Sequence, residues 1–408
     1  MYKAIKSLYN NVSSCVRINK MYTDWFDVKS GLRQGCGLSP ILFNFFINDM
    51  ALKLKALDLG IEVENGDKVC ILLYADDVVL VAENEKDLQM MLDHLYEWIT
   101  NNGLSINVTE SNIVHFRTRS VERTNFNFMC GETSLNIVDK YVYLGLTLDE
   151  FLNYNTTAKF VAQSASRALG LLTAKYKLVG GMPYNVFSKL FDSLVWSVIA
   201  YGTAIWGTRQ FPCIDAIQNR AMCLFLGVSK YTPSAALIGD MGWQPITIRQ
   251  LSSITNLWVR LCKMSATRIN HRIFFYTFHA SSNRCKNWCY RVKLWYQKVK
   301  CNELCTLNLV ASKQSIVEKV KKTAIEEFVK DWKNKVNSDI GSSNVGGSKL
   351  RTYKLFKTEF KVEEYCKKIM SRTHRSALAK SKLADMKGSS CMNDCVHSVL
   401  TRLNLNFT

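Results

Sequence analysis

The sequence predicts an α+β region over residues 1–150, followed by a basic, all-α region. Two apolar runs, residues 69–75 and 78–82, are separated only by two aspartates, a pattern typical of buried strands joined by a tight turn. Beyond residue 150, apolar residues recur three or four positions apart, as in helices that bury one face. The charge changes at the same point: residues 1–150 carry 14 Lys+Arg and 20 Asp+Glu, and the remainder carries 39 and 14.

The composition is that of a globular protein. Of 408 residues, 48% are hydrophobic and 21% are charged, which argues against disorder, a collagen-like chain or a small disulfide scaffold. The length favours two or three domains. The formal net charge is +19, and the excess of basic residues beyond residue 150 favours a polyanionic partner such as nucleic acid.

In the first region, two helices have recognisable starts. We expect Ser39 to cap a helix with Pro40 in its first turn, because serine favours the N-cap and proline tolerates that turn. We expect Asn84 to cap a second helix, with Leu92 and neighbouring apolar residues on one face, that ends near Gly103. Segments Ile113–Arg117 and Tyr141–Leu148 follow as predicted strands of a mixed sheet.

The second region consists of helices at regular intervals. Helical periodicity covers residues 160–178, 183–201, 212–226, 246–264 and 316–336. Residues 338–348 are rich in Gly and Ser and nearly uncharged, which predicts a flexible linker before a Lys-rich helical segment.

Asp76 and Asp77 are the strongest chemical signal in the sequence. Two carboxylates within an apolar stretch are costly to bury unless a cation neutralises them. Carboxylates at a hairpin turn suit Mg²⁺, which keeps several waters and bridges to substrate phosphates. A solvent-facing turn with no further role is the alternative interpretation.

The segment Gly31–Phe43 is the second signal. Its three glycines allow a close approach of backbone to another molecule, Arg33 can meet a phosphate, and Gln34 can make amide contacts. A loop that only caps the following helix is the alternative interpretation.

Together with a third motif, these segments resemble the reverse transcriptases of non-LTR (LINE-like) retrotransposons. GLRQGCGLSPILFNFFIND is similar to the family's template-and-nucleotide motif, LLYADDVVLVAE to its catalytic hairpin, and YVYLGLTLD to its primer-grip hairpin, in the family's order. LVWSVIAYGTAIWG, IQNRAMCLFLGV and GDMGWQPI extend the resemblance to about residue 265.

The resemblance implies a partial right-hand polymerase fold. Residues 1–150 would be a partial palm with a mixed sheet, and residues 151–265 a helical thumb-like domain. A basic helical region over 266–337, the linker 338–348 and a Lys-rich helical segment over 349–408 would complete the chain.

The resemblance also implies site roles. Asp76 and Asp77 would be the catalytic, metal-binding carboxylates, with magnesium or alternatively manganese as cofactor. Residues of the nucleotide- and template-binding site would be Arg33, Gln34, Gly35, Ser39 and Pro40. Residues near the primer end would be Tyr74, Ala75, Tyr143, Leu144 and Gly145.

The implied function is RNA-directed DNA polymerisation, with an RNA template, a DNA primer strand and deoxynucleoside triphosphates as partners. The family's other catalytic aspartate lies on a strand several dozen residues before the template motif, and the chain starts too late to include it. We therefore expect an incomplete copy, an RNA-directed DNA polymerase by family whose two carboxylates hold metal and nucleotide poorly without their third partner, so that the isolated fragment is inactive. A catalytically inactive remnant that still binds RNA or RNA–DNA hybrid is the alternative.

Two segments interleave basic and aromatic residues: CKNWCYRVKLWYQKVK and KLRTYKLFKTEFKVEEYCKK. This composition suits phosphate pairing and base stacking, although amphipathic helices that pack their aromatics inward have the same composition.

Location and cysteine use complete the expectations. The longest uncharged segment, Ser193–Thr208, is too short for a membrane span and is expected to be a core helix, and the N-terminus lacks an apolar signal block. We therefore expect an intracellular protein, nuclear or cytoplasmic, whose cysteines are free thiols.

Cysteine groups at 285–305 and 391–397 have spacings that zinc can use, but we favour a structural role because cysteines four apart share one helix face.

Overall fold

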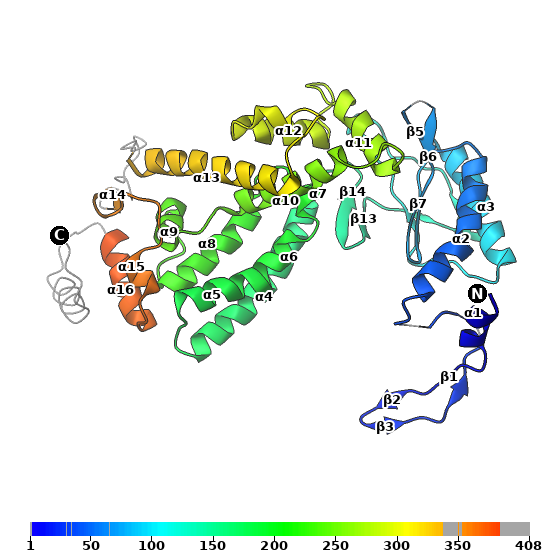
Figure 1. Ribbon diagram of the computed structural model, residues 1–408, viewed down its shortest axis with the longest axis horizontal. Coiled ribbons are helices and arrows are strands. Elements are labelled where there is room, and N and C mark those ends of the chain that lie inside the picture. Colours follow the sequence, from blue (N-terminus) through cyan, green and yellow to red (C-terminus); the bar gives the residue numbers. More distant parts are fainter. Residues whose placement is uncertain are drawn as a thin grey trace. The chain divides into compact units, whose positions relative to one another are not determined.

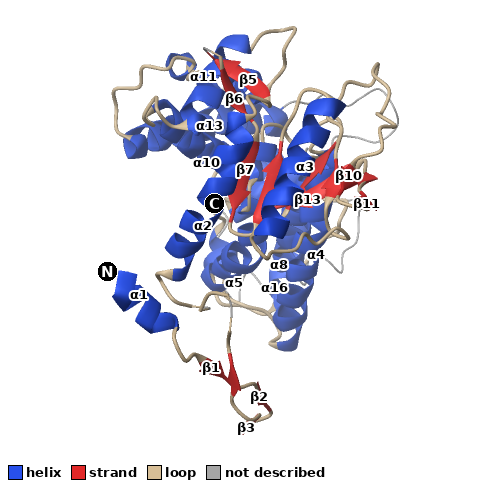
Figure 2. Ribbon diagram, turned by 90° about the vertical axis from the view of Figure 1, so that its right-hand side faces the viewer, coloured by secondary structure: helices blue, strands red, loops and turns tan. Residues whose placement is uncertain are grey.

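The computed structural model describes residues 2–29, 31–33, 35–64, 66–337, 350 and 353–383 (Figures 1 and 2). The chain divides into two compact units. The first, here called the N-terminal unit, comprises residues 1–112 and 125–136; the second, the helical unit, comprises residues 113–124 and 137–408.

The N-terminal unit combines short strand pairs with three helices. Its elements are α1 (Tyr2–Tyr9), β1 (Ser13–Ser14), β2 (Arg17–Ile18), β3 (Met21–Tyr22), β4 (Phe26–Asp27), α2 (Ser39–Ala56), β5 (Ile61–Glu64), β6 (Asp67–Val69), β7 (Ile71–Tyr74), β8 (Asp77–Leu80), α3 (Glu85–Asn101), β10 (Met129–Cys130) and β11 (Thr133–Ser134). The described strands pair two by two and antiparallel: β1 with β4, β2 with β3, β5 with β6, β7 with β8, and β10 with β11.

The core of this unit lies between the β7–β8 hairpin and the helices α2 and α3. Ile71 pairs with Leu80 across the hairpin, and Ile71 packs in one cluster with Met50 of α2 and Met91 of α3. Trp98 of α3 is buried in the same cluster. The predicted pair of strands with a tight turn is therefore confirmed, and its apolar residues hold it against two helices.

Of the two predicted helix starts, one is confirmed and one is wrong. Asn84 caps α3, because its Oδ1 accepts a hydrogen bond from the Asp87 backbone N–H at 2.9 Å. At α2 the N-cap position is Leu38, and Ser39 is already helical. The Ser39 hydroxyl instead donates to the Arg33 carbonyl oxygen at 2.8 Å and lies 3.1 Å from the Tyr9 hydroxyl. The serine therefore ties the preceding loop to the helix start.

An arm formed by β1–β4 extends from this unit (Figure 1). At its tip Asn19 and Lys20 both have positive φ, 47° and 71°, as required by a two-residue hairpin turn of the mirror-image type. Several large apolar side chains of the arm are exposed: Ile18, Met21, Tyr22, Trp25 and Phe26.

The helical unit contains most of the helices. Its elements are β13 (Lys140–Tyr143), β14 (Leu146–Asp149), α4 (Asn155–Leu178), α5 (Tyr184–Leu190), the π-helical η1 (Phe191–Trp196), α6 (Ser197–Ala200), α7 (Thr203–Trp206), α8 (Pro212–Leu226), α9 (Ser234–Met241), α10 (Ile246–Cys262), α11 (Ile269–Ala280), α12 (Trp288–Lys298), the 3₁₀ turn η2 (Asn302–Leu304), α13 (Lys313–Asn337), α14 (Tyr353–Phe356), α15 (Glu364–Lys367) and α16 (Arg372–Leu383). Strands β9 (Asn112–Ile113) and β12 (Asn136–Ile137) lie where the chain passes between the units.

The long helices confirm the periodicity in the sequence, and they surround two apolar clusters. One cluster joins α4, α5 and α8 around Phe187 and Phe225; the other joins α10 to α13 around Trp258, which contacts Phe274 and Tyr296. The predicted all-α character of the region beyond residue 150 therefore holds for its described residues.

Three expectations about local structure are wrong. Among the described residues every sheet has two strands only, so no larger mixed sheet forms there. Of the strand expected at Ile113–Arg117, only Ile113 lies in a strand, at the end of β9. The single helix expected over Ser193–Thr208 is interrupted at Gly202, whose φ of +59° ends one helix before the next begins.

The segment 353–383 folds back onto the helices that precede it. Tyr353 and Tyr365 donate hydrogen bonds to the two carboxylate oxygens of Asp240, at 2.9 and 2.5 Å. Arg375 is buried against the Phe225 ring and donates to the Tyr176 hydroxyl at 3.0 Å. This segment is thus part of the helical core.

The linker expected at residues 338–348 lies outside the described residues, as do the cysteines at 391 and 395. Every described cysteine is a free thiol, as expected. Within the described ranges, no helix has the length and apolarity needed to cross a membrane.

Candidate functional site

The turn of the β7–β8 hairpin presents the two predicted catalytic carboxylates. Tyr74 pairs with Asp77, so that Ala75 and Asp76 form a two-residue turn. Ala75 has a φ of +52°, a left-handed conformation that is strained for a residue with a Cβ. Asp76 and Asp77 are exposed, and neither carboxylate has a hydrogen-bond or ion-pair partner among the described residues. Their negative charges therefore remain uncompensated.

The glycine-rich loop precedes α2 in the same unit. Arg33, Gly35 and Pro40 are exposed, Ser39 is buried, and Gln34 lies outside the described residues. Hydrogen bonds from the backbone N–H groups of Leu38 and Ser39 lower the pKa of the Cys36 thiol. The start of α2 therefore favours negative charge, as helix N-termini do.

The structure holds the loop and the hairpin in one unit through the packing of α2. Ile47, Met50 and Leu54 of α2 share a core cluster with Cys70 and Ile71 at the start of β7. Among the described residues no hydrogen bond or ion pair joins the loop to Asp76 or Asp77. The two motifs are thus fixed by a common core.

The third motif belongs to the helical unit. Strands β13 and β14 pair from Lys140 with Asp149 to Tyr143 with Leu146, and Leu144 and Gly145 form the turn. The Tyr201 hydroxyl donates to the Leu144 carbonyl oxygen at 2.6 Å. A Cβ at Gly145 would lie 3.1 Å from the Tyr201 ring. The hairpin turn is therefore seated on the helix break at Tyr201.

The donor set at the hairpin suits a hard divalent cation. Two free carboxylates at one turn supply oxygen ligands, and Mg²⁺ is commonly held by one or two carboxylates with water and substrate phosphates. Within the described ranges, no group of three or more His, Cys, Asp or Glu side chains converges as a metal site. Asp76 and Asp77 therefore place two free carboxylates at one turn, without a third such side chain beside them among the described residues.

Comparison with protein families matches this part of the chain. Residues 2–148 match the family described as reverse transcriptase (RNA-dependent DNA polymerase). Over these residues the chain is similar to a reverse transcriptase domain. The matched range includes the glycine-rich loop, the Asp76–Asp77 hairpin and nearly all of the β13–β14 hairpin.

Similar proteins come from transposable elements. An uncharacterized transposon-derived protein of Caenorhabditis elegans is 27% identical over 35% of this chain and 50% of its own length. The probable RNA-directed DNA polymerase from transposon BS of Drosophila melanogaster is 22% identical over 59% of this chain and 27% of its own. The Pol polyprotein of the type-1 retrotransposable element R2 of Nasonia vitripennis is 27% identical over 48% and 21%. The matches thus span half or less of these relatives' lengths.

The structure shows two features that sequence reasoning missed. The Tyr9–Ser39 contact links α1 to the glycine-rich loop, and no sequence pattern marks it. The helical unit also has a polar pocket lined in part by Trp243, Arg249 and Lys321. Trp243 lies in the segment GDMGWQPI, but only the fold brings α13 beside it.

Proposed function

We propose that the reverse transcriptase domain of this chain takes part in RNA-directed DNA synthesis, extending a DNA 3′ end on an RNA template. The observation that carries this proposal is the pair of unpartnered carboxylates, Asp76 and Asp77, at the turn of a hairpin inside the matched domain. The substrates would be deoxynucleoside triphosphates, a primer strand and a template, as the resemblance implies.

Asp76 and Asp77 would hold divalent cations, Mg²⁺ or Mn²⁺, through their free oxygens. When bound, such ions lower the pKa of the attacking hydroxyl and neutralise charge on the phosphates. The hairpin contributes position, because its strands are fixed by the α2–α3 core while its turn is open to solvent. Tyr74, which is 64% exposed beside the turn, would support the end of the primer.

The glycine-rich loop would bind the incoming nucleotide and the template base. Arg33 is exposed and can pair with a phosphate, and Gly35, with a φ of +77°, leaves open space for a close approach. The helix start at Pro40 adds a region of positive potential. Gln34 is assigned here by resemblance.

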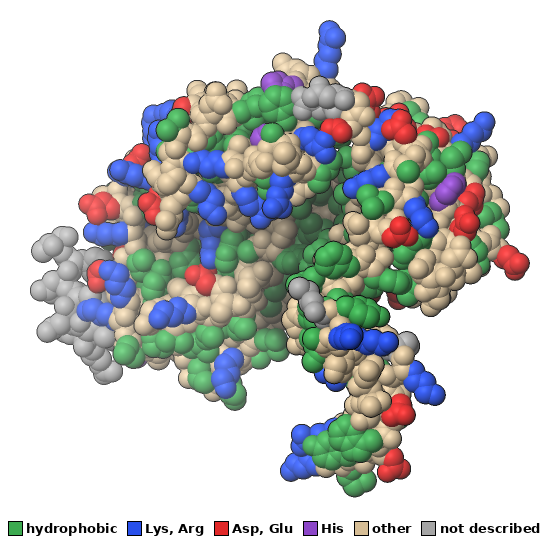
Figure 3. All heavy atoms as spheres, turned by 45° about the vertical axis from the view of Figure 1, so that its right-hand side comes forward, with side chains coloured by type: hydrophobic (Ala, Val, Ile, Leu, Met, Phe, Trp, Pro, Cys, Tyr) green, Lys and Arg blue, Asp and Glu red, His purple; other side chains and the backbone are tan. Residues whose placement is uncertain are grey.

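The helical unit would hold the nucleic acid beyond the primer end. We assign residues 151–265 as the thumb and residues 266–337 as a further basic helical region, with Tyr143, Leu144 and Gly145 near the primer strand. Lys and Arg side chains are spread over the part drawn on the left of Figure 3, with few acidic side chains among them. Such a surface favours phosphate contacts whose strength falls as salt concentration rises.

A catalytically inactive, nucleic-acid-binding protein is the second candidate. The observation that favours it is the charge distribution, because residues 151–408 carry 39 Lys+Arg against 14 Asp+Glu whether or not the hairpin is active. On this hypothesis the chain binds RNA or RNA–DNA hybrid and does not extend it.

Primer extension on an RNA template separates the two candidates. If the first candidate is right, the chain extends the primer with Mg²⁺ or Mn²⁺. The double variant Asp76→Asn/Asp77→Asn should then reduce the rate more than about 100-fold, because cation binding supplies several kcal/mol of transition-state stabilisation. Glu97→Gln on the exposed side of α3 is the matched control and should change the rate less than about twofold. No extension by the intact chain, with salt-dependent hybrid binding retained, would support the second candidate.

A further inference from the structure

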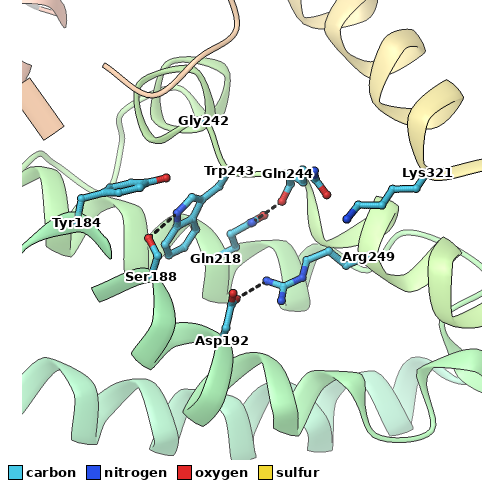
Figure 4. A pocket seen from close by; sticks show the side chains of 9 residues that line it. All are labelled: Tyr184, Ser188, Asp192, Gln218, Gly242, Trp243, Gln244, Arg249 and Lys321. Atoms are coloured by element: carbon cyan, nitrogen blue, oxygen red, sulfur yellow. Dashed lines mark hydrogen bonds and ion pairs between the residues drawn. The ribbon is translucent and has the colours of Figure 1, made fainter. Parts of the chain in front are cut away.

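The helical unit contains a polar pocket that the proposed polymerase chemistry does not use. Its volume is about 340 Å³, and its walls come from α5, η1, α8, α10, α13 and the loop between α9 and α10. Figure 4 shows the side chains that line it. This volume lies at the lower end of the range for small-molecule sites, so it can admit one ligand of modest size.

One wall of the pocket is aromatic and rigid. Trp243 packs against Phe191 with ring centroids 4.6 Å apart and is stacked on Phe187 at 6.2 Å. Its indole N–H donates to the Ser188 hydroxyl at 3.2 Å. The indole ring is therefore held in place; it is only 9% exposed, and this small exposed part lines the pocket as an apolar edge.

The pocket also has amide groups available for a ligand. Gln218 is only 3% exposed, and its Nε2 donates to the Gln244 backbone carbonyl at 2.8 Å. Its Oε1 has no hydrogen-bond partner among the described residues and is not one of the fully buried unsatisfied atoms, so it remains accessible to solvent or to a ligand. The side chain of Gln244 likewise makes no hydrogen bond within the described part of the chain. Donor and acceptor capacity is thus left unused beside Trp243.

Two cations stand on the side of the pocket opposite Trp243 (Figure 4). Arg249 is fixed by an ion pair with Asp192 at 2.7 Å and by the Trp196 ring, whose centroid lies 4.1 Å from its guanidinium carbon. Lys321 of α13 forms no ion pair with a described residue. The side with Arg249 and Lys321 therefore carries a net positive charge that a bound anion would balance.

We propose that this pocket binds a single nucleotide. The base would lie against Trp243 with its edge hydrogen-bonded by Gln218 and Gln244, and the phosphate would contact Lys321 and Arg249. An apolar aromatic edge and unused amides suit a base, and an uncompensated cation suits a phosphate, whereas a bare phosphate would use only the cation. The pocket belongs to a different unit from Asp76 and Asp77, so this proposal stands or fails independently of the polymerase proposal.

Isothermal titration calorimetry on the full chain tests the pocket with three probes: adenosine 5′-monophosphate, adenosine and inorganic phosphate. We expect the nucleotide to bind at least tenfold more tightly than either part alone. Lys321→Gln should weaken nucleotide binding about tenfold and leave adenosine unchanged, because it removes one charge-assisted contact. Lys322→Gln, which changes the neighbouring exposed lysine of the same helix, is the matched control and should alter nucleotide affinity less than twofold.

Gln244→Ala tests the other end of the pocket and preserves the backbone carbonyl that Gln218 uses. It should weaken the nucleotide and adenosine by the same factor. No nucleotide binding by the intact chain, or equal losses in Lys321→Gln and Lys322→Gln, would overturn the proposal.

The nucleotide could be free or part of a strand, and photocrosslinking distinguishes these sources. A single-stranded RNA containing 4-thiouridine should crosslink to the peptide that contains Trp243, and adenosine 5′-monophosphate should compete, if the pocket takes a nucleotide of a strand. Calorimetric binding of the monophosphate without such a crosslink would assign the pocket to a free nucleotide.

Discussion

Gly202 is the position at which a single methyl group should have the clearest effect on the predicted primer-grip hairpin. Its φ is +59°, so an alanine there adopts a left-handed conformation, at about 1–2 kcal/mol. The added Cβ would also lie 2.6 Å from Leu146 Cδ2, on the strand that follows the hairpin turn. Overpacking costs about 1–3 kcal/mol, and the end of the Leu146 side chain can move partly aside, so we expect Gly202→Ala to lower the free energy of unfolding by about 2–3 kcal/mol in total.

Gly180→Ala is the matched control in the same unit. Gly180 also has a positive φ, +72°, but a Cβ there would meet no atom within 4 Å. Gly180→Ala should therefore lower the free energy of unfolding only by the cost of the left-handed backbone conformation, about 1–2 kcal/mol. The difference between the two variants, measured by urea denaturation followed by circular dichroism, isolates the steric overlap with Leu146.

A double-mutant cycle identifies the atoms responsible. Leu146→Ala removes both Cδ atoms, so Gly202→Ala should be less destabilising in that background than in the native chain. Equal destabilisation by Gly202→Ala and Gly180→Ala, or additive effects of Gly202→Ala and Leu146→Ala, would refute the packing of the hairpin on the Tyr201–Gly202 helix break.

Two further predictions concern titratable groups. Hydrogen bonds from Arg123 and Arg117 hold the pKa of Glu150 below its ordinary value. The contribution of Glu150 to stability is therefore present above about pH 4.3 and is lost as pH falls through the lower pKa of the folded state. In urea denaturation at a series of pH values, Glu150→Gln should reduce the loss of stability at acidic pH, and an unchanged loss would contradict the assignment. Backbone N–H groups lower the pKa of Cys36, whereas burial raises the pKa of Cys262 to about 12. At pH 8, iodoacetamide should therefore modify Cys36 at least about tenfold faster than Cys262. Mass spectrometry of the peptides measures both rates, and equal rates would be inconsistent with these environments.

Local patterns in the sequence predict the elements whose order depends on nearby residues. The β7–β8 hairpin follows from two apolar runs around Asp76–Asp77, and the start of α3 follows from Asn84. The long helices follow from apolar spacing. These features could be predicted because a turn, a cap and a helical face are each encoded within a few residues.

Contacts between distant residues account for the failures. Ser39 could cap α2 by type, but Arg33 and Tyr9 engage its hydroxyl. The strand expected at Ile113–Arg117 ends at Ile113, whose carbonyl accepts from the Val138 backbone N–H, 25 residues away in the chain. The strands could have joined one mixed sheet, yet in the described residues they pair two by two, because strand pairing depends on partners far away in the sequence.

For the candidate site, the sequence by itself determined that two carboxylates follow one strand and that the basic residues lie in the C-terminal two-thirds. Only the tertiary structure decided that these carboxylates are free and exposed at a turn, and that Trp243, Arg249 and Lys321 from three separate segments line one pocket. The physical reason is that composition and hydrogen-bonding capacity belong to the residues, whereas burial, partners and remaining charge arise only when segments far apart in the chain pack together.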